Sequence, residues 1–287
     1  MANPAIIAEN LTYRYGKLTA VDHINFQVGE GEILGFLGPN GAGKTTTVKM
    51  LTGQLLPAEG RAELLGMDIT KHTKKIQSQI GVCFEQTNLY EAMTAADNLK
   101  LFARLFGVQG FDADALLERV GLPGKGKSRV ETFSKGMRQR LMVARALVNQ
   151  PRILFLDEPT EGLDPVSAET IRNIILEEKS QGITVFLTTH DMVEADKISN
   201  RVAFINQGKI VALDTPHALK QQYGKRALIA EVVSSDGNFT TREIVMDEQD
   251  TPNAVEKLFA NEKVVTIHSE EATLEDIFIQ ITGRGLV

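Results

Sequence analysis

The sequence is poor in the features that mark secreted and membrane proteins. Its 287 residues include one cysteine, Cys83, so no intramolecular disulfide can form, and this absence favours a reducing compartment. No apolar run approaches the roughly 18 residues that cross a bilayer as a helix. Residues 1–4 lack the charged start and the apolar stretch of a signal peptide. We therefore expect a chain that does not itself insert into a membrane.

The composition is that of a globular protein with a substantial core. Hydrophobic residues make up 43% and charged residues 24% of the chain. The net charge of −6 is unevenly spread, because residues 226–287 hold 12 acidic and 5 basic side chains. This shift in composition predicts a main domain of residues 1–222 and a small C-terminal accessory domain of residues 223–287.

The most informative stretch is a glycine-rich loop that fits the spacing G-x-x-x-x-G-K-[ST]. In such a loop the backbone N–H groups cradle phosphates, the lysine reaches the β- and γ-phosphates, and the threonine hydroxyl holds Mg²⁺. Residues 33–37 before the loop read as a buried strand, and residues 45–51 after it have helical spacing. This context predicts a phosphate site at a helix N-terminus, and not merely a glycine-rich turn. The loop consists of Gly38, Pro39, Asn40, Gly41, Ala42, Gly43, Lys44, Thr45 and Thr46.

A second motif places two carboxylates at the end of a short apolar strand. Residues 153–156 are apolar and lead into Asp157 and Glu158. Downstream of a phosphate loop, this pattern is typical of an Asp that holds Mg²⁺ and a Glu that acts as base toward a water. Strands predicted over 80–84 and 184–189 end near Gln86 and His190, which are either ordinary loop residues or members of the same site.

The remaining segments predict what surrounds this core. Residues 6–16 and 24–28 read as strands of an antiparallel sheet, with Tyr15 as an edge-strand tyrosine or a platform for a planar partner. Residues 95–106 and 113–120 indicate helices inserted into the core, and Ser134 fits the N-cap of a further helix. The small domain should contain strands, a helix over 252–260 and a last helix whose apolar stripe forms that domain's core. The stripe comprises Leu274, Ile277, Phe278 and Ile281.

The elements therefore predict an α/β protein. It has a P-loop NTPase core with an antiparallel β subdomain, a helical insertion at about 89–147, and a small α+β C-terminal domain. Residues 5 to about 222 resemble the ATP-binding subunit of ABC transporters, because the motifs occur in that family's order. They are the Walker A loop from Gly38 to Thr45, the glutamine loop at Gln86, the signature Phe133–Met137, the Walker B residues Asp157 and Glu158, the D-loop Gly162–Asp164, and the switch His190.

The resemblance implies ATP and Mg²⁺ as ligands and assigns a role to each motif. Tyr15 would stack on adenine, and the loop from Gly38 to Thr46 would hold the phosphates. The metal would be served by Thr45, Gln86 and Asp157. The catalytic groups would be Glu158, His190 and Gln86. The ATP held by the other subunit would be contacted by Ser134, Gly136, Met137 and Asp164.

The resemblance also implies partners, since each ATP is sandwiched between two cassettes head to tail. A second copy of the chain would complete the site, and the helical insertion would dock a separate transmembrane permease near Gln86, at the cytoplasmic face of the membrane. ATP binding would close the dimer and hydrolysis would reopen it.

Two alternatives remain open at this stage. A soluble ABC ATPase acting on ribosomes or DNA usually carries two cassettes or a coiled-coil insertion, and neither is present, so we expect no nucleic-acid partner. A regulatory ATP binder that does not hydrolyse is disfavoured because Lys44, Asp157, Glu158 and His190 are all present.

One position departs from the usual signature L-S-G-G-Q. Lys135 replaces the first glycine, and the side chain either adds a cation near the partner's phosphate or faces solvent. The signature variant S-K-G-M and the sequence of residues 272–278 near the C-terminus both resemble the corresponding segments of the ABC-2 type exporter branch.

Overall fold

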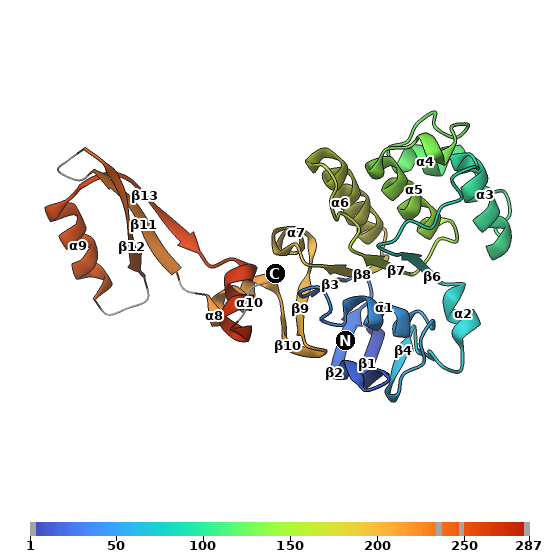
Figure 1. The fold of residues 1–287 in the computed structure, drawn as a ribbon, viewed down its shortest axis with the longest axis horizontal. Coiled ribbons are helices and arrows are strands. Elements are labelled where there is room, and N and C mark those ends of the chain that lie inside the picture. The colour runs from blue at the N-terminus through green and yellow to red at the C-terminus, as the bar shows by residue number, and fades with distance from the viewer. Residues whose placement is uncertain (1–3, 225, 234–236, 247–249, 284–287) are drawn as a thin grey trace. The chain divides into compact units, whose positions relative to one another are not determined.

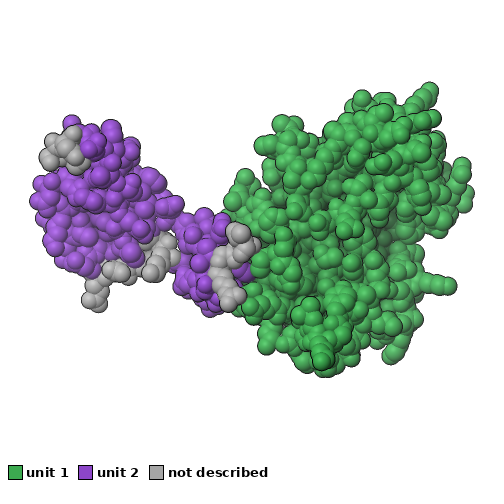
Figure 2. Space-filling model, in the orientation of Figure 1, with its two compact units in different colours: residues 1–213, 287 green, residues 214–286 purple. Residues whose placement is uncertain are grey.

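The computed structural model describes residues 4–224, 226–233, 237–246 and 250–283 (Figure 1). The chain forms two compact units, one up to Leu213 and one from Asp214 onward (Figure 2). Composition alone placed this boundary near 223. It falls earlier because α8 (Pro216–Tyr223) packs on α10 (Leu274–Thr282) within the second unit.

The first unit is built on a six-stranded sheet with the order β10-β9-β3-β8-β7-β6. Every residue of its central strands β3, β7 and β8 is buried, which explains why these segments are continuous apolar runs without alternation. The pairs β3–β8, β3–β9, β7–β8 and β6–β7 are parallel, so the carboxyl ends of these strands meet at one edge. The strands are β3 (Ile33–Leu37), β6 (Ile80–Cys83), β7 (Ile153–Asp157), β8 (Thr184–Thr189), β9 (Arg201–Asn206) and β10 (Lys209–Asp214).

The predicted antiparallel subdomain is a four-stranded sheet with the order β2-β1-β4-β5. Phe26 on this sheet packs against Phe36 and Phe186 of the first sheet, with both pairs of ring centroids 5.8 Å apart. Met67 and Asp68 form a short strand, and the chain turns just before them. The strands are β1 (Pro4–Tyr15), β2 (Leu18–Gly29), β4 (Glu59–Leu64) and β5 (Met67–Asp68).

The predicted helical insertion is confirmed, and local capping explains its bounds. The Thr94 hydroxyl accepts a hydrogen bond from the Asp97 N–H, and Gly107 ends the same helix in the left-handed conformation. Figure 1 shows α3, α4 and α5 gathered beside α6. Arg119 on α4 and Glu178 on α6 form an ion pair of 2.5 Å, which ties the insertion to the core. The helices of this region are α3 (Ala95–Phe106), α4 (Ala113–Arg119), α5 (Lys135–Leu147) and α6 (Pro165–Ser180).

The first unit also contains the α-helices α1, α2 and α7. Within the described ranges no helix is long and apolar enough to cross a membrane. The helix α1 follows the glycine-rich loop, and α7 follows His190. Their bounds are α1 (Lys44–Leu51), α2 (Thr73–Gln77) and α7 (Met192–Ile198).

The second unit holds a three-stranded antiparallel sheet, β12-β11-β13, covered by α9. Its small core consists of Ala230, Val232 and Leu258. The apolar stripe of α10 was expected to form this core, but that helix packs on α8. Periodicity shows that a helix buries one face, but it does not say which element covers that face. The elements are β11 (Arg226–Val233), β12 (Phe239–Val245), α9 (Thr251–Asn261) and β13 (Lys263–Glu271).

Candidate functional site

The glycine-rich loop lies between β3 and α1, as the sequence predicts. Two of its glycines leave no room for a side chain, because a Cβ at Gly38 would lie 2.2 Å from the Ile205 carbonyl oxygen and one at Gly43 would lie 2.5 Å from that of Ala20. Gly43 also has a φ of 111°, a conformation that disfavours any residue with a Cβ. The loop is therefore held between β9 and the start of β2, with its backbone open to one side.

A cavity of about 440 Å³ lies on that open side. Its walls include Tyr15, which is 47% exposed and meets Tyr13 edge to face at 4.8 Å, and the exposed Leu18. Leu18, Ala20 and Glu85 also line the cavity, and no motif in the sequence points to them. The complete lining is Tyr15, Leu18, Ala20, Pro39, Asn40, Gly41, Gly43, Lys44, Thr45, Thr46, Glu85 and Glu158.

Three side chains, two of which line the cavity, form a chain of contacts. Lys44 Nζ lies 3.0 Å from Glu158 Oε1, and both side chains are buried. The same ammonium donates to the carbonyls of Gly38 at 2.6 Å and Pro39 at 3.2 Å. Glu158 Oε2 lies 3.0 Å from His190 Nδ1 and accepts from the His190 backbone N–H. The carboxylate of Glu158 thus bridges the loop lysine and the histidine, with its own backbone in the left-handed region at φ 50°.

Asp157 ends β7 and is almost completely buried. Its Oδ1 accepts a hydrogen bond from the Thr188 hydroxyl, whereas its Oδ2 has no hydrogen-bond partner among the described residues. Burial raises the pKa of Asp157, and the neighbouring Thr188 and Thr45 hydroxyls oppose that shift.

A free buried carboxylate oxygen near a threonine hydroxyl fits a hard divalent cation. In the described part of the chain no three His, Cys, Asp or Glu side chains gather closely enough to hold a metal alone. The arrangement therefore suits Mg²⁺, which commonly takes one or two carboxylates together with phosphate oxygens.

Gln86 does not line the cavity, and the neighbouring Glu85 does. Both residues follow β6 and are exposed. Burial raises the pKa of Glu85, and the negative charges of Glu161, Asp157 and Glu158 raise it further. Glu85 could be recognised in the sequence as an acidic residue just after a strand, but nothing in the sequence showed that it lines the cavity and Gln86 does not.

The signature residues lie together at the start of α5 and are not part of the cavity lining. The Ser134 hydroxyl accepts from the Met137 N–H and caps α5, as predicted. Asp164 caps α6 by accepting from the Ser167 N–H. The Ser167 hydroxyl, and next this N–H, lower the pKa of Asp164. A Cβ at Gly136 would lie 2.3 Å from Ser167 Oγ, so this glycine lets the two helix starts approach closely.

Lys135 reaches toward the D-loop of its own chain. A Cβ on Gly162 would lie 2.4 Å from Lys135 Nζ. Gly162 also has a φ of 61°. The missing side chain of Gly162 therefore makes space for the lysine that replaces the first signature glycine.

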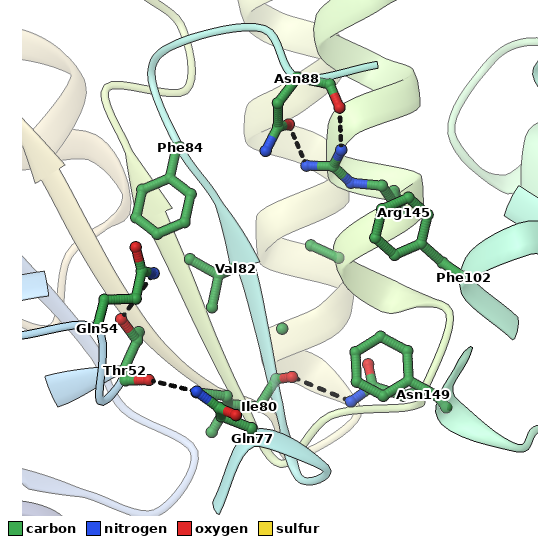
Figure 3. Close-up of a pocket in the computed structure, with 13 residues that line it drawn as sticks. Thr52, Gln54, Gln77, Ile80, Val82, Phe84, Asn88, Phe102, Arg145 and Asn149 are labelled. Atoms are coloured by element: carbon green, nitrogen blue, oxygen red, sulfur yellow. Dashed lines mark hydrogen bonds between the residues drawn. The ribbon is translucent and has the colours of Figure 1, made fainter. Parts of the chain in front are cut away.

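A second hollow of about 300 Å³ opens between β6, α3 and α5 (Figure 3). Phe84 and Phe102 contribute aromatic surface, and the Arg145 guanidinium lies 4.8 Å from the centre of the Phe102 ring. Arg145 also donates to the backbone carbonyl of Asn88 at 2.7 Å. Residues of β6 and of α3, the first helix of the insertion, form walls of this groove. Its lining is Thr52, Gln54, Gln77, Ile80, Gly81, Val82, Phe84, Asn88, Phe102, Phe106, Arg145, Ala146 and Asn149.

The chain is similar in sequence to known proteins of one family. Residues 21–161 match the ABC transporter family. A fluoroquinolones export ATP-binding protein of Mycobacterium tuberculosis is 44% identical over 283 residues, which cover 98% of this chain and 94% of that protein. The bacitracin transport ATP-binding protein BcrA of Bacillus licheniformis is 36% identical, with 97% of each chain covered.

One solved structure of similar fold is a dimer with bound nucleotide. The dimeric ATP-binding cassette MJ0796, in a post-hydrolysis state with ADP and phosphate, superposes with a TM-score of 0.68 at 26% identity, over 73% of this chain and 98% of that one. With a loop shaped for phosphates, a carboxylate beside it and relatives that span nearly its whole length, the chain belongs to the ABC transporter family as one of its ATP-binding, ATP-hydrolysing subunits.

Proposed function

We propose that this chain powers an exporter as a homodimer, with each ATP held between the glycine-rich loop of one copy and the signature of the other. The observation that carries this proposal is the separation of the two motifs within a chain. Lys44 and Thr45 line the phosphate cavity, whereas Ser134 and Gly136 do not. A second copy would bring its Ser134 hydroxyl and the N-terminus of its α5 to the open side of the cavity, where the helix dipole favours phosphate.

The chemistry follows from the contacts of Glu158. Its buried carboxylate is held by His190 on one side and by Lys44 on the other. When the phosphates engage Lys44, Glu158 is released to orient and deprotonate a water, while His190 stays close enough to contact the γ-phosphate. Mg²⁺, held by Thr45 and Asp157 with the phosphates, would neutralise charge that develops on the transferred group.

The partner that transmits this cycle is a separate membrane permease. The groove in Figure 3 supports this, because it presents apolar rings on the helical insertion beside the segment that carries Gln86. Apolar grooves of this kind receive amphipathic helices of a partner. The relatives, which are named for fluoroquinolones export and bacitracin transport, support an antibiotic-like cargo. As an ATP-binding subunit the chain would act at the cytoplasmic face of the membrane.

Sedimentation of the Glu158→Gln protein with and without Mg-ATP tests the homodimer. Loss of the base should slow turnover by about 10²–10⁴-fold, so that ATP remains bound and the dimer accumulates. The matched control adds Ser134→Asp, which still caps α5 but places a negative charge against the partner's ATP, and should remain monomeric. A Glu158→Gln protein that binds ATP and stays monomeric would contradict the homodimer, whereas failure to bind ATP would contradict the ATPase itself.

A further inference from the structure

We infer that Glu85, and not Gln86, is the side chain from the end of β6 that completes the metal site, and that its carboxylate makes nucleotide binding depend strongly on a divalent cation. This inference rests on the proposed ATPase function. It assigns to this chain an acidic group at a place where the family resemblance implies a neutral glutamine amide.

Glu85 lines the same cavity as the catalytic carboxylate of Glu158. Strands β6 and β7 are parallel, and their last pair is Cys83 with Leu156. Two residues after this pair come Glu85 on one chain segment and Glu158 on the other. Both residues line the phosphate cavity, together with Thr45 from the loop. Gln86 lies one residue further along the chain and is absent from the lining.

Glu85 adds to an excess of negative charge in and around the cavity. Among the lining residues Lys44 is the single cation, and it is already paired with Glu158 at 3.0 Å. The charged groups that act on Glu85 are Lys44 and three carboxylates, those of Glu161, Asp157 and Glu158. A triphosphate that enters this cavity without a metal therefore meets an excess of negative charge.

A divalent cation relieves this repulsion, and carboxylate oxygens are ligands that Mg²⁺ prefers. The Oδ2 of buried Asp157 accepts no hydrogen bond from the described residues, and the Thr45 hydroxyl lies close to this carboxylate. Glu85 would contribute a further anionic oxygen, directly or through a metal-bound water. The consequence is a large ratio between nucleotide affinity with Mg²⁺ and affinity without it.

The test is to measure the dissociation constant of a non-hydrolysable ATP analogue for the full chain in EDTA and in Mg²⁺. Removal of one carboxylate in Glu85→Gln should reduce the Mg²⁺ enhancement by roughly tenfold, with metal-free binding becoming tighter. The control Gln86→Ala changes the neighbouring residue, which does not line the cavity, and should keep the wild-type ratio.

A second readout follows the metal directly. Electron paramagnetic resonance of Mn²⁺ in the ADP complex should show weaker Mn²⁺ binding in Glu85→Gln and unchanged binding in Gln86→Ala. Equal Mg²⁺ enhancement in the wild type and in Glu85→Gln would overturn the inference, as would a reduced enhancement in Gln86→Ala alone. If the wild type bound no nucleotide, the proposed function would fail as well, so the two failures are distinguishable.

Discussion

Lys44 Nζ lies 3.0 Å from Glu158 Oε1, so the cation that the phosphate loop offers to a nucleotide is already paired with the catalytic carboxylate. Both side chains are buried, and Lys44 also donates to two carbonyls of its own loop. A phosphate that binds Lys44 must therefore displace Glu158. The same displacement frees the carboxylate that the reaction needs as a base.

This relationship predicts that Glu158→Gln binds Mg-ADP more tightly than the wild type. The neutral amide competes less well with phosphate for Lys44, because the pairing of two buried charges has been removed. We expect an affinity gain of about three- to tenfold, since exchanging one charged contact is worth roughly 1 kcal/mol. Isothermal titration calorimetry with ADP measures this gain without the complication of hydrolysis.

The matched control for that gain is Glu169→Gln, which removes an exposed acidic residue of α6 that is not part of the cavity lining. It should leave ADP affinity close to that of the wild type, because long-range charge effects at the surface are small. A similar gain in both variants would attribute the effect to overall charge, and unchanged affinity in Glu158→Gln would show that the Lys44–Glu158 pair does not compete with phosphate.

The loop glycines predict two different outcomes for the same substitution. At Gly43 a Cβ would lie 2.5 Å from the Ala20 carbonyl oxygen, at a φ of 111°. At Gly41 nothing lies within 4 Å of the Cβ position, and only the φ of 79° disfavours alanine. Gly43→Ala should therefore abolish ATP binding and lower the melting temperature, whereas Gly41→Ala should cost about 1–2 kcal/mol and keep measurable binding.

Thermal unfolding and binding of a fluorescent ATP analogue distinguish these two variants. Equal losses in both would mean that the loop shifts away from Ala20 without penalty, and the close approach seen here would not be needed for phosphate binding.

Elements whose start and end are set by nearby residues were predictable from the sequence. The helix over residues 95–106 was predicted with the observed bounds, because Thr94 and Gly107 cap it locally. The strands at 33–37 and 184–189 were equally clear as short β-rich apolar segments. The packing of α10 on α8 was not predictable, because an apolar stripe does not show which surface it packs against.

The same distinction holds for the site. The loop that contains Lys44 and the strand that ends at Asp157 are local patterns, and parallel pairing in one sheet brings them to the same edge. Whether Glu85 or Gln86 faces the phosphates depends on a shift of one residue between β6 and β7, and neither segment alone specifies that register. The contact of Lys135 with Gly162 likewise joins residues far apart in sequence.

The last prediction concerns a buried carboxyl group beside the site. The carboxylate of Glu194 on α7 accepts a hydrogen bond from the Thr160 hydroxyl, two residues after Glu158. Burial raises the pKa of Glu194 above its ordinary value of 4.5, the Thr160 bond opposes the shift, and Asp191, Arg172 and Glu158 act more weakly. Because the folded-state pKa is raised, the stability that the protonated group contributes is fully present below about pH 4.5 and is lost as pH rises through the folded-state pKa.

Glu194→Gln stays neutral at every pH, so its free energy of unfolding relative to the wild type should increase as pH rises from about 4.5 to neutrality. Urea unfolding at a series of pH values measures that difference, with the denaturant slope as a check that both proteins unfold alike. Thr160→Val in the wild-type background should make stability fall more steeply with pH, because it removes the bond that opposes the shift. A difference between Glu194→Gln and the wild type that is constant from pH 4.5 to 8 would mean that Glu194 titrates alike in the folded and unfolded chains.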